Sequence, residues 1–152
     1  MGMSASGIIA FGIPLDEDDA LFPEIEEGDD PEYASGFSEE NFEKWIAEQA
    51  GIIAPQEEWV QGSKNTAWSY YWDRQRKAVA EFPIEVVAHC SCDYPLYIIA
   101  LRGTVMKAWD GEPRDIMLPS IPAEKVQMLI DFCAEHGIKG AAPRWLLTSN
   151  WG

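Results

Sequence analysis

The spacing of hydrophobic positions changes several times along this chain, and each change predicts a different element. The first apolar run, residues 7–13, is short and is followed by Pro14, which favours a strand over a helix. From Asp16 to Glu32 the residues are mostly acidic and are interrupted by Pro and Gly, so we expect a loop there.

Helical spacing begins after this loop. Over residues 39–50 one face of a helix would carry Phe42, Trp45, Ile46 and Gln49. Ser38 is placed to cap that helix, and Phe37 is placed to pack on Phe42 as a hydrophobic staple. The opposite face, which we expect to be solvated, carries Glu40, Lys44 and Glu48.

A second helix is predicted from about Lys64 to Glu81, where aromatic and other residues again recur three and four positions apart. These residues are Trp68, Tyr71, Trp72, Gln75, Val79 and Phe82. Ser63 is placed as the N-cap, and Pro83 ends the helix. Most of the aromatic residues should be core, but their number leaves room for one or two anchors at an interface.

Two near-continuous apolar runs follow, Ile84–Ser91 and Leu96–Leu101. Both are rich in Ile, Val and Tyr, which predicts an antiparallel hairpin at the centre of a sheet. Residues 104–109 are a candidate for one more strand.

The pattern returns to helical spacing after Pro122. The predicted apolar stripe consists of Val126, Leu129, Ile130 and Cys133. It ends at His136 and Gly137, and residues 143–149 predict a last strand. Because helices and strands do not alternate regularly, we predict a single α+β domain over residues 1–152. We expect a mostly antiparallel sheet of about four to five strands, with two to three helices packed on it.

All of the net charge lies in one segment. Between Asp16 and Glu58 the chain has sixteen acidic residues and a single basic residue, Lys44, which is a net charge of −15 over 43 residues. The remainder has ten acidic and ten basic residues. The segment joins the predicted loop to the predicted helix at 39–50, so part of this charge should be held on an ordered helix.

This acidity limits the classes of partner and compartment. With a pI near 4.3, the chain lacks a cluster of Lys and Arg large enough to hold a nucleic-acid backbone or an anionic membrane. The apolar run 7–13 is too short to span a bilayer or to act as a signal sequence. We therefore expect a soluble cytoplasmic protein with reduced cysteines that binds neither nucleic acid nor membrane.

The Cys and His residues allow a zinc site as one interpretation. Cys133 and His136 have the spacing of a common half-site near a helix end, and His89, Cys90 and Cys92 would supply the rest. However, Cys90 and Cys92 do not have the usual Cys-x-x-Cys spacing, and a thiol on an apolar stripe needs no ligand role. We therefore predict no metal and no cofactor, with Cys90, Cys92, Cys133 and His136 as fallback ligands.

The same five residues would serve an alternative function, a metal- or thiol-dependent enzyme. The chain has no Gly-x-Ser-x-Gly elbow, no phosphate-binding Gly-rich loop, no His-Glu-x-x-His and no dinucleotide fingerprint. We predict that the protein is not an enzyme and assign no catalytic residues.

The acidic segment has two interpretations that the residues leave open. It can be a solvated loop that keeps the protein in solution, or a fixed array of carboxylates that attracts a basic partner. In the second interpretation the partner-binding residues are Asp29, Asp30, Glu32, Glu40, Glu43 and Glu48.

The C-terminal half resembles a group of small uncharacterised proteins of tailed bacteriophages and prophages. The resemblance rests on residues 89–100 (His-Cys-Ser-Cys-Asp-Tyr-Pro-Leu-Tyr-Ile-Ile-Ala), on Gly103-Thr104 and on residues 145–152 (Trp-Leu-Leu-Thr-Ser-Asn-Trp-Gly). It implies an accessory protein that acts by binding a host or defence component, in the host cytoplasm. The acidic segment lies outside the resembling part.

Together these observations predict a small non-enzymatic binding protein, of the phage inhibitor type, that presents carboxylates to a basic, nucleic-acid-handling host or defence protein. A virion or assembly component, which would form a homo-oligomer, is a further alternative.

Overall fold

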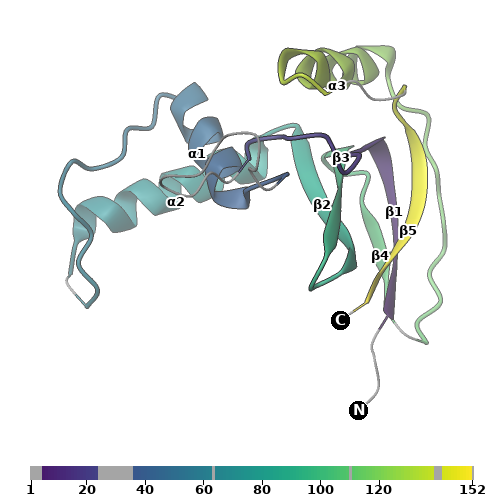
Figure 1. Cartoon of the computed structure of the whole chain (residues 1–152), viewed down its shortest axis with the longest axis horizontal. Coiled ribbons are helices and arrows are strands. Elements are labelled where there is room, and N and C mark those ends of the chain that lie inside the picture. Colours follow the sequence, from purple (N-terminus) through teal and green to yellow (C-terminus); the bar gives the residue numbers. More distant parts are fainter. Residues whose placement is uncertain (1–4, 24–35, 63, 110, 139–141, 152) are drawn as a thin grey trace. The chain divides into compact units, whose positions relative to one another are not determined.

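The computed structural model describes residues 5–23, 36–62, 64–109, 111–138 and 142–151. These residues have the predicted α+β fold, with three helices and a five-stranded sheet among them (Figure 1). The elements in chain order are β1 (Ala5–Pro14), α1 (Glu39–Gln49), α2 (Thr66–Glu81), β2 (Ile84–Ser91), β3 (Pro95–Leu101), β4 (Met106–Ala108), α3 (Ala123–Glu135) and β5 (Arg144–Trp151).

The chain divides into two compact units. We call residues 1–21 and 83–152 the sheet unit and residues 22–82 the helical unit. Of the helices predicted to pack on the sheet, α3 does so against β3, whereas α1 and α2 pack against each other in the helical unit. The single-domain organisation over residues 1–152 stays a prediction.

The sheet is mixed, because one of its pairings is parallel. β1 pairs antiparallel with β5 along most of its length, and β2 and β3 form the predicted antiparallel hairpin. The parallel pairing joins the end of β2 to the end of β5, at Cys90–Ser91 and Asn150–Trp151. Since β1 also pairs with β3, the pairings run β1–β5–β2–β3–β1 and return to their start.

Gly12 lies where β1 meets β3. Along one edge, β1 pairs first with β4 through residues 7–9 and then with β3 through residues 12–14. A Cβ atom at Gly12 would lie 2.1 Å from the backbone oxygen of Ile99, which is closer than any real contact allows. Glycine is therefore the residue that lets the two strands approach and the ring of pairings close.

The core of the sheet unit is built largely from every second residue of its strands, whose side chains point to the same face of the sheet. Its main cluster consists of Ile8, Ala10, Val87, Ile98 and Ala100. On α3 the buried residues are Leu129, Phe132 and Cys133. The predicted stripe was wrong at Ile130, which is 37% exposed. Phe132 is buried instead, because it lies three residues after Leu129, on the same helical face.

The two helices of the helical unit begin with side-chain caps. At α1, Ser38 Oγ accepts a hydrogen bond from the backbone N–H of Asn41 at 3.2 Å, and the rings of Phe37 and Phe42 pack with centroids 5.9 Å apart, as predicted. At α2 the predicted cap was wrong. Asn65 Oδ1 accepts from the N–H of Ala67, so α2 starts later than expected, and Ser63 itself lies outside the described residues.

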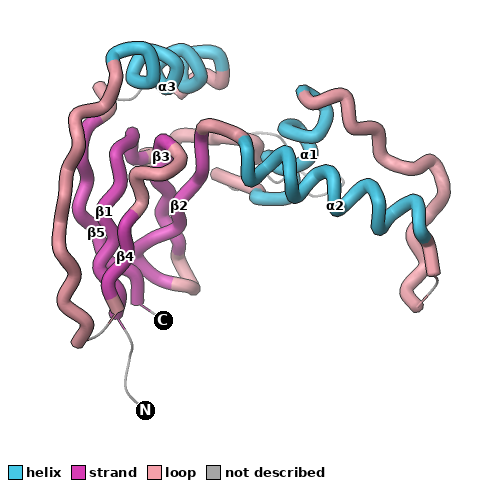
Figure 2. Tube along the Cα trace, turned by 180° about the vertical axis from the view of Figure 1, so that it is seen from behind, coloured by secondary structure: helices cyan, strands magenta, loops and turns pink. Residues whose placement is uncertain are grey.

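The connection between β4 and α3 is long, and its described part runs alongside the sheet (Figure 2). Every described residue from 111 to 120 is exposed. Within the described ranges, no helix combines the length and the apolar character needed to cross a membrane.

Candidate functional site

Three of the predicted partner-binding residues lie on the ordered helix α1. Glu40 and Glu48 are exposed, and Glu43 is half-buried. At 3.6 residues per turn, Glu43 and Glu48 lie on either side of Glu40 around the helix axis, so the three residues together span less than half of its circumference. Asp29, Asp30 and Glu32, the other predicted partner-binding residues, lie outside the described residues. We call Glu40, Glu43 and Glu48 the acidic face of α1.

Glu43 is a carboxylate of this face with a raised pKa. Its partial burial raises the pKa, and the nearby carboxylates of Glu39 and Glu40 raise it further. By contrast, Glu40 is paired with Lys44, its Oε1 lying 2.7 Å from Nζ across one helical turn. Glu43 has no ion pair among the residues that the structure describes, so its charge is available to a ligand.

Glu40 and Glu43 of the acidic face border a cavity of about 610 Å³ between α1 and α2. The volume lies in the range of small-ligand and side-chain pockets. We call it the acidic–aromatic groove, and its main lining residues are Glu40, Glu43, Trp68, Tyr71, Trp72 and Gln75. Carboxylates come from α1 and aromatic rings from α2, so the groove offers negative charge and π faces to the same ligand.

The aromatic wall is held in place by neighbouring groups. The Trp68 indole N–H donates to the backbone oxygen of Glu57 at 2.8 Å. Its ring packs edge-on against Tyr71 at 5.7 Å and in a tilted arrangement against Trp72 at 5.6 Å. Trp59 also packs on Trp72, edge to face, with the two ring centroids 5.9 Å apart. Trp72 is nevertheless 36% exposed, so a rigid ring faces solvent.

Gln75 is the buried polar residue of the groove. It is 8% exposed and lines the cavity. Within the described part of the chain, its amide makes no hydrogen bond, and its polar atoms are open to solvent in the groove. A ligand can replace the water at such an amide with a hydrogen bond of its own. The amide is therefore suited to contact a polar group that enters the groove.

Two basic residues stand at the edge of the groove, and both are engaged locally. Lys44 pairs with Glu40 on α1, and Arg76 pairs with Asp73 on α2. The Nε–H of Arg76 also donates to the backbone oxygen of Trp72 at 3.4 Å. Both side chains are largely exposed, so these pairs hold the two cations at the rim.

The groove itself was not predicted from the sequence. Its aromatic residues were expected mostly as core of the second helix, and only the surplus of Trp and Tyr in residues 68–72 suggested an interface. Which face of α2 would meet the carboxylates depends on the packing of α1 on α2, which periodicity within one helix does not specify.

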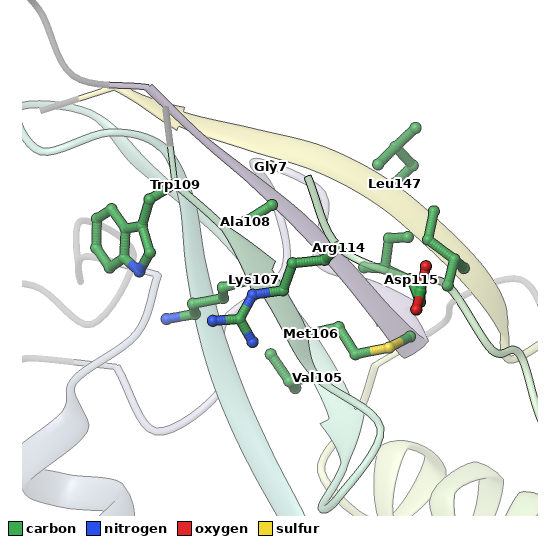
Figure 3. Close-up of a pocket in the computed structure, with 11 residues that line it drawn as sticks. Gly7, Val105, Met106, Lys107, Ala108, Trp109, Arg114, Asp115 and Leu147 are labelled. Carbon is green, nitrogen blue, oxygen red and sulfur yellow. The ribbon is translucent and has the colours of Figure 1, made fainter. Parts of the chain in front are cut away.

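The sheet unit has a second cavity, of about 510 Å³, with a different character (Figure 3). Its walls are mostly apolar and come from β1, β4, β5 and the loop after β4. In Figure 3 the cationic side chains of Lys107 and Arg114 extend to the same side of it. This cavity matches a basic partner less well than the acidic–aromatic groove does, because its lining has two cations and a single carboxylate, Asp115, whereas the groove has two carboxylates and two cations.

The Cys and His residues do not converge. Cys90 and Cys92 lie at the β2–β3 turn, whereas Cys133 and His136 belong to α3 at the opposite end of the sheet (Figure 1). Among the described residues, no group of three or more His, Cys, Asp or Glu is placed to hold a metal ion. The zinc interpretation from these residues was therefore wrong in its geometry.

The chemistry of these side chains fits local packing. Burial raises the pKa of the Cys133 thiol to about 11, with a further contribution from Asp19, so it stays protonated at neutral pH and is a poor nucleophile. Burial lowers the pKa of His89, whose Nδ1 lies 2.9 Å from the Thr148 hydroxyl oxygen on β5. Burial likewise lowers the pKa of His136.

Cys90 departs from the expected regular strand. Its φ of 78° lies in the left-handed region, at the point where β2 pairs with both β3 and β5. Cys92 follows the end of β2 in the turn and is exposed. Cys90 therefore has an irregular backbone conformation within β2, and Cys92 lies beyond the end of the strand.

Comparison of the chain with protein-family models, with curated proteins and with solved structures finds no match. The functional argument therefore rests on the site itself.

Proposed function

We propose that this protein is a non-enzymatic binding protein that docks the acidic face of α1 on a basic surface of another protein. The observation that carries the proposal is the placement of Glu40, Glu43 and Glu48 on a capped, packed helix beside an aromatic groove. Carboxylates held on a helix lose less conformational freedom on binding than carboxylates in a loop, so more of their attraction is available for affinity.

The kind of partner follows from charge. The helical unit alone has fourteen acidic and five basic residues, a net charge of −9 over 61 residues. Such a field speeds association with a positively charged surface and discriminates against acidic proteins. Proteins that handle nucleic acids carry surfaces of this kind, because they bind phosphates with Lys and Arg. A phage-type inhibitor of such a host or defence protein is the biological setting we propose, in the cytoplasm of the host.

The test begins with capture of partners from a bacterial lysate at low salt, followed by measurement of affinity for the purified partner at 50 and 300 mM NaCl. We expect affinity to fall steeply with salt, because screening weakens attraction between exposed charges. The triple variant Glu40→Gln, Glu43→Gln and Glu48→Gln should weaken binding at least tenfold.

A matched control removes the same charge elsewhere. Glu112, Glu124 and Glu135 are exposed residues of the sheet unit. Their triple Gln variant should bind the partner within about twofold of the original protein at 150 mM NaCl, because none of the three residues belongs to the acidic face of α1. Equal losses in both variants, or binding that does not depend on salt, would contradict the proposed docking face.

A further inference from the structure

The acidic–aromatic groove has the features of a receptor for one cationic side chain. We propose that it binds an arginine side chain of the partner. This inference rests on the proposed function, since it names the partner group that the acidic face of α1 positions. Its evidence differs from that of the proposed function, because it depends on the aromatic wall of the groove and on Gln75.

The first step of the argument is the match of charge and π faces. A guanidinium group over an indole or phenol ring is attracted by the negative face of the ring. Trp68, Tyr71 and Trp72 line one wall, and Glu43 on α1 lines the other with a carboxylate that has no ion pair in the described residues. A cation between these walls meets attraction from both sides, whereas an anion would be repelled by Glu43.

The second step is the preference for arginine over lysine. Gln75 is a largely buried residue that lines the groove, and its amide, which is open to solvent there, makes no hydrogen bond in the described part of the chain. Its carbonyl oxygen can accept one hydrogen bond. Arginine has five N–H donors in a planar fork, so it can stack on Trp72 while donating to Gln75 and to Glu43. A lysine ammonium cannot stack in this way.

The third step concerns the protein's own cations. Lys44 and Arg76 line the same groove, and each is held at its rim by a local carboxylate. If the groove receives a cation, Arg76 opposes binding by like-charge repulsion. If it receives an anion, Arg76 is a ligand. The effect of removing Arg76 therefore has opposite signs for the two kinds of ligand.

The probe is a set of three short peptides of identical length, each with three copies of one residue separated by serine. That residue is arginine, lysine or citrulline, which has nearly the shape of arginine without its charge. Binding to the full chain is followed at low salt by NMR of the tryptophan indole N–H groups. We expect the arginine peptide to bind at least tenfold more tightly than the citrulline peptide, and more tightly than the lysine peptide.

Four variants locate the site. Trp72→Leu should weaken binding of the arginine peptide on the order of fivefold, the size of one cation–π contact. Gln75→Leu keeps the size of the side chain and should weaken it by about threefold to tenfold. Arg76→Gln should tighten it. Trp109→Leu, at a 59% exposed tryptophan of the sheet unit, should leave it unchanged. Circular dichroism establishes that each variant is folded.

The outcomes separate this inference from the proposed function. Loss of partner binding in the acidic-face variant, with no effect of Trp72→Leu or Gln75→Leu on the peptide, overturns the groove inference alone. Suppose instead that peptide binding is weaker in these two variants, but that affinity for the partner changes neither with salt nor in the acidic-face variant. That result overturns the proposed function alone. Weaker binding in Arg76→Gln, or equal binding of arginine and citrulline peptides, also overturns the arginine site.

Discussion

At the scale of single residues, Gly12 shows most directly how one position determines the topology. The backbone of β3 approaches it so closely that a methyl group would have to occupy the place of the Ile99 oxygen. The conflict is with backbone atoms of a paired strand, which cannot move aside as a flexible side chain can.

We therefore expect Gly12→Ala to lower the free energy of unfolding by about 3 kcal/mol or more. Gly7 offers a matched control in the same strand, because a Cβ atom there would meet nothing within 4 Å. Gly7→Ala should change stability by less than about 0.5 kcal/mol. Urea unfolding of both variants measures the difference, and equal stabilities would show that β1 and β3 are not in close contact.

Glu43 is a residue at which stability and binding have opposite requirements. Burial, Glu39 and Glu40 raise its pKa in the folded chain. A carboxyl group with a raised pKa binds protons more tightly when folded, so its contribution makes stability fall as pH rises through that pKa. The charged form is nevertheless the one that attracts a cation.

We expect Glu43→Gln to increase the free energy of unfolding at pH 7 while weakening cation binding. Binding of a cationic peptide to the original protein should tighten as pH rises through the raised pKa of Glu43, and this part of the pH dependence should be absent in Glu43→Gln. The other charged residues that line the same groove are Glu40, Lys44 and Arg76. Unchanged pH dependence in the variant would show that another group titrates.

At the scale of elements, the N-terminus of α1 connects folding to the proposed docking face. Ser38 accepts the N–H of Asn41 and is itself 9% exposed, so the cap is part of the packed unit. Loss of an N-cap typically destabilises a helix by about 1 kcal/mol. Because the carboxylates of the acidic face lie within three turns of this cap, fraying would disturb their spacing.

Ser38→Ala should lower the free energy of unfolding by about 1 kcal/mol, measured by chemical denaturation. Ser38→Asp keeps an oxygen acceptor at the same position and should retain most of the stability. Equal destabilisation by Ala and Asp would show that packing of the serine, and not its hydrogen bond, stabilises the start of α1.

The elements themselves were largely predictable because hydrophobic spacing is a local property. β2 has the predicted bounds Ile84–Ser91, and the cap and staple of α1 were confirmed at Ser38, Phe37 and Phe42. Errors arose where two local signals competed. Ser63 and Asn65 are both good caps, and the structure uses Asn65.

The pairing of strands and the packing of helices on one another were not predictable from this spacing. The parallel pairing of Cys90 with Asn150 links residues 60 positions apart, and nothing in either strand specifies the other. The same holds for the groove, in which Glu43 and Gln75 meet through the packing of two helices. Periodicity assigns each residue to a face, but the partner of that face depends on tertiary packing.

At the scale of the whole molecule, carboxylates far outnumber cations, since the chain has 26 acidic and 11 basic residues. Three of the described ion pairs, Lys44–Glu40, Arg76–Asp73 and Lys77–Glu81, join neighbouring positions of one helix and are largely exposed. Such pairs contribute little to stability. Arg102–Glu85, at 3.2 Å, is less exposed. Repulsion among carboxylates should therefore outweigh attraction in the folded chain.

This balance predicts that moderate salt stabilises the protein while weakening its partner binding. Raising NaCl from 20 to 300 mM at pH 7 should increase the midpoint of thermal unfolding, because screening relieves repulsion in the compact state. Near pH 4.3, where the net charge approaches zero, the increase should disappear. A fall in the midpoint at pH 7 would show that attractive pairs dominate. Since the expected effects on stability and on binding have opposite signs, loss of the partner at high salt cannot be attributed to unfolding.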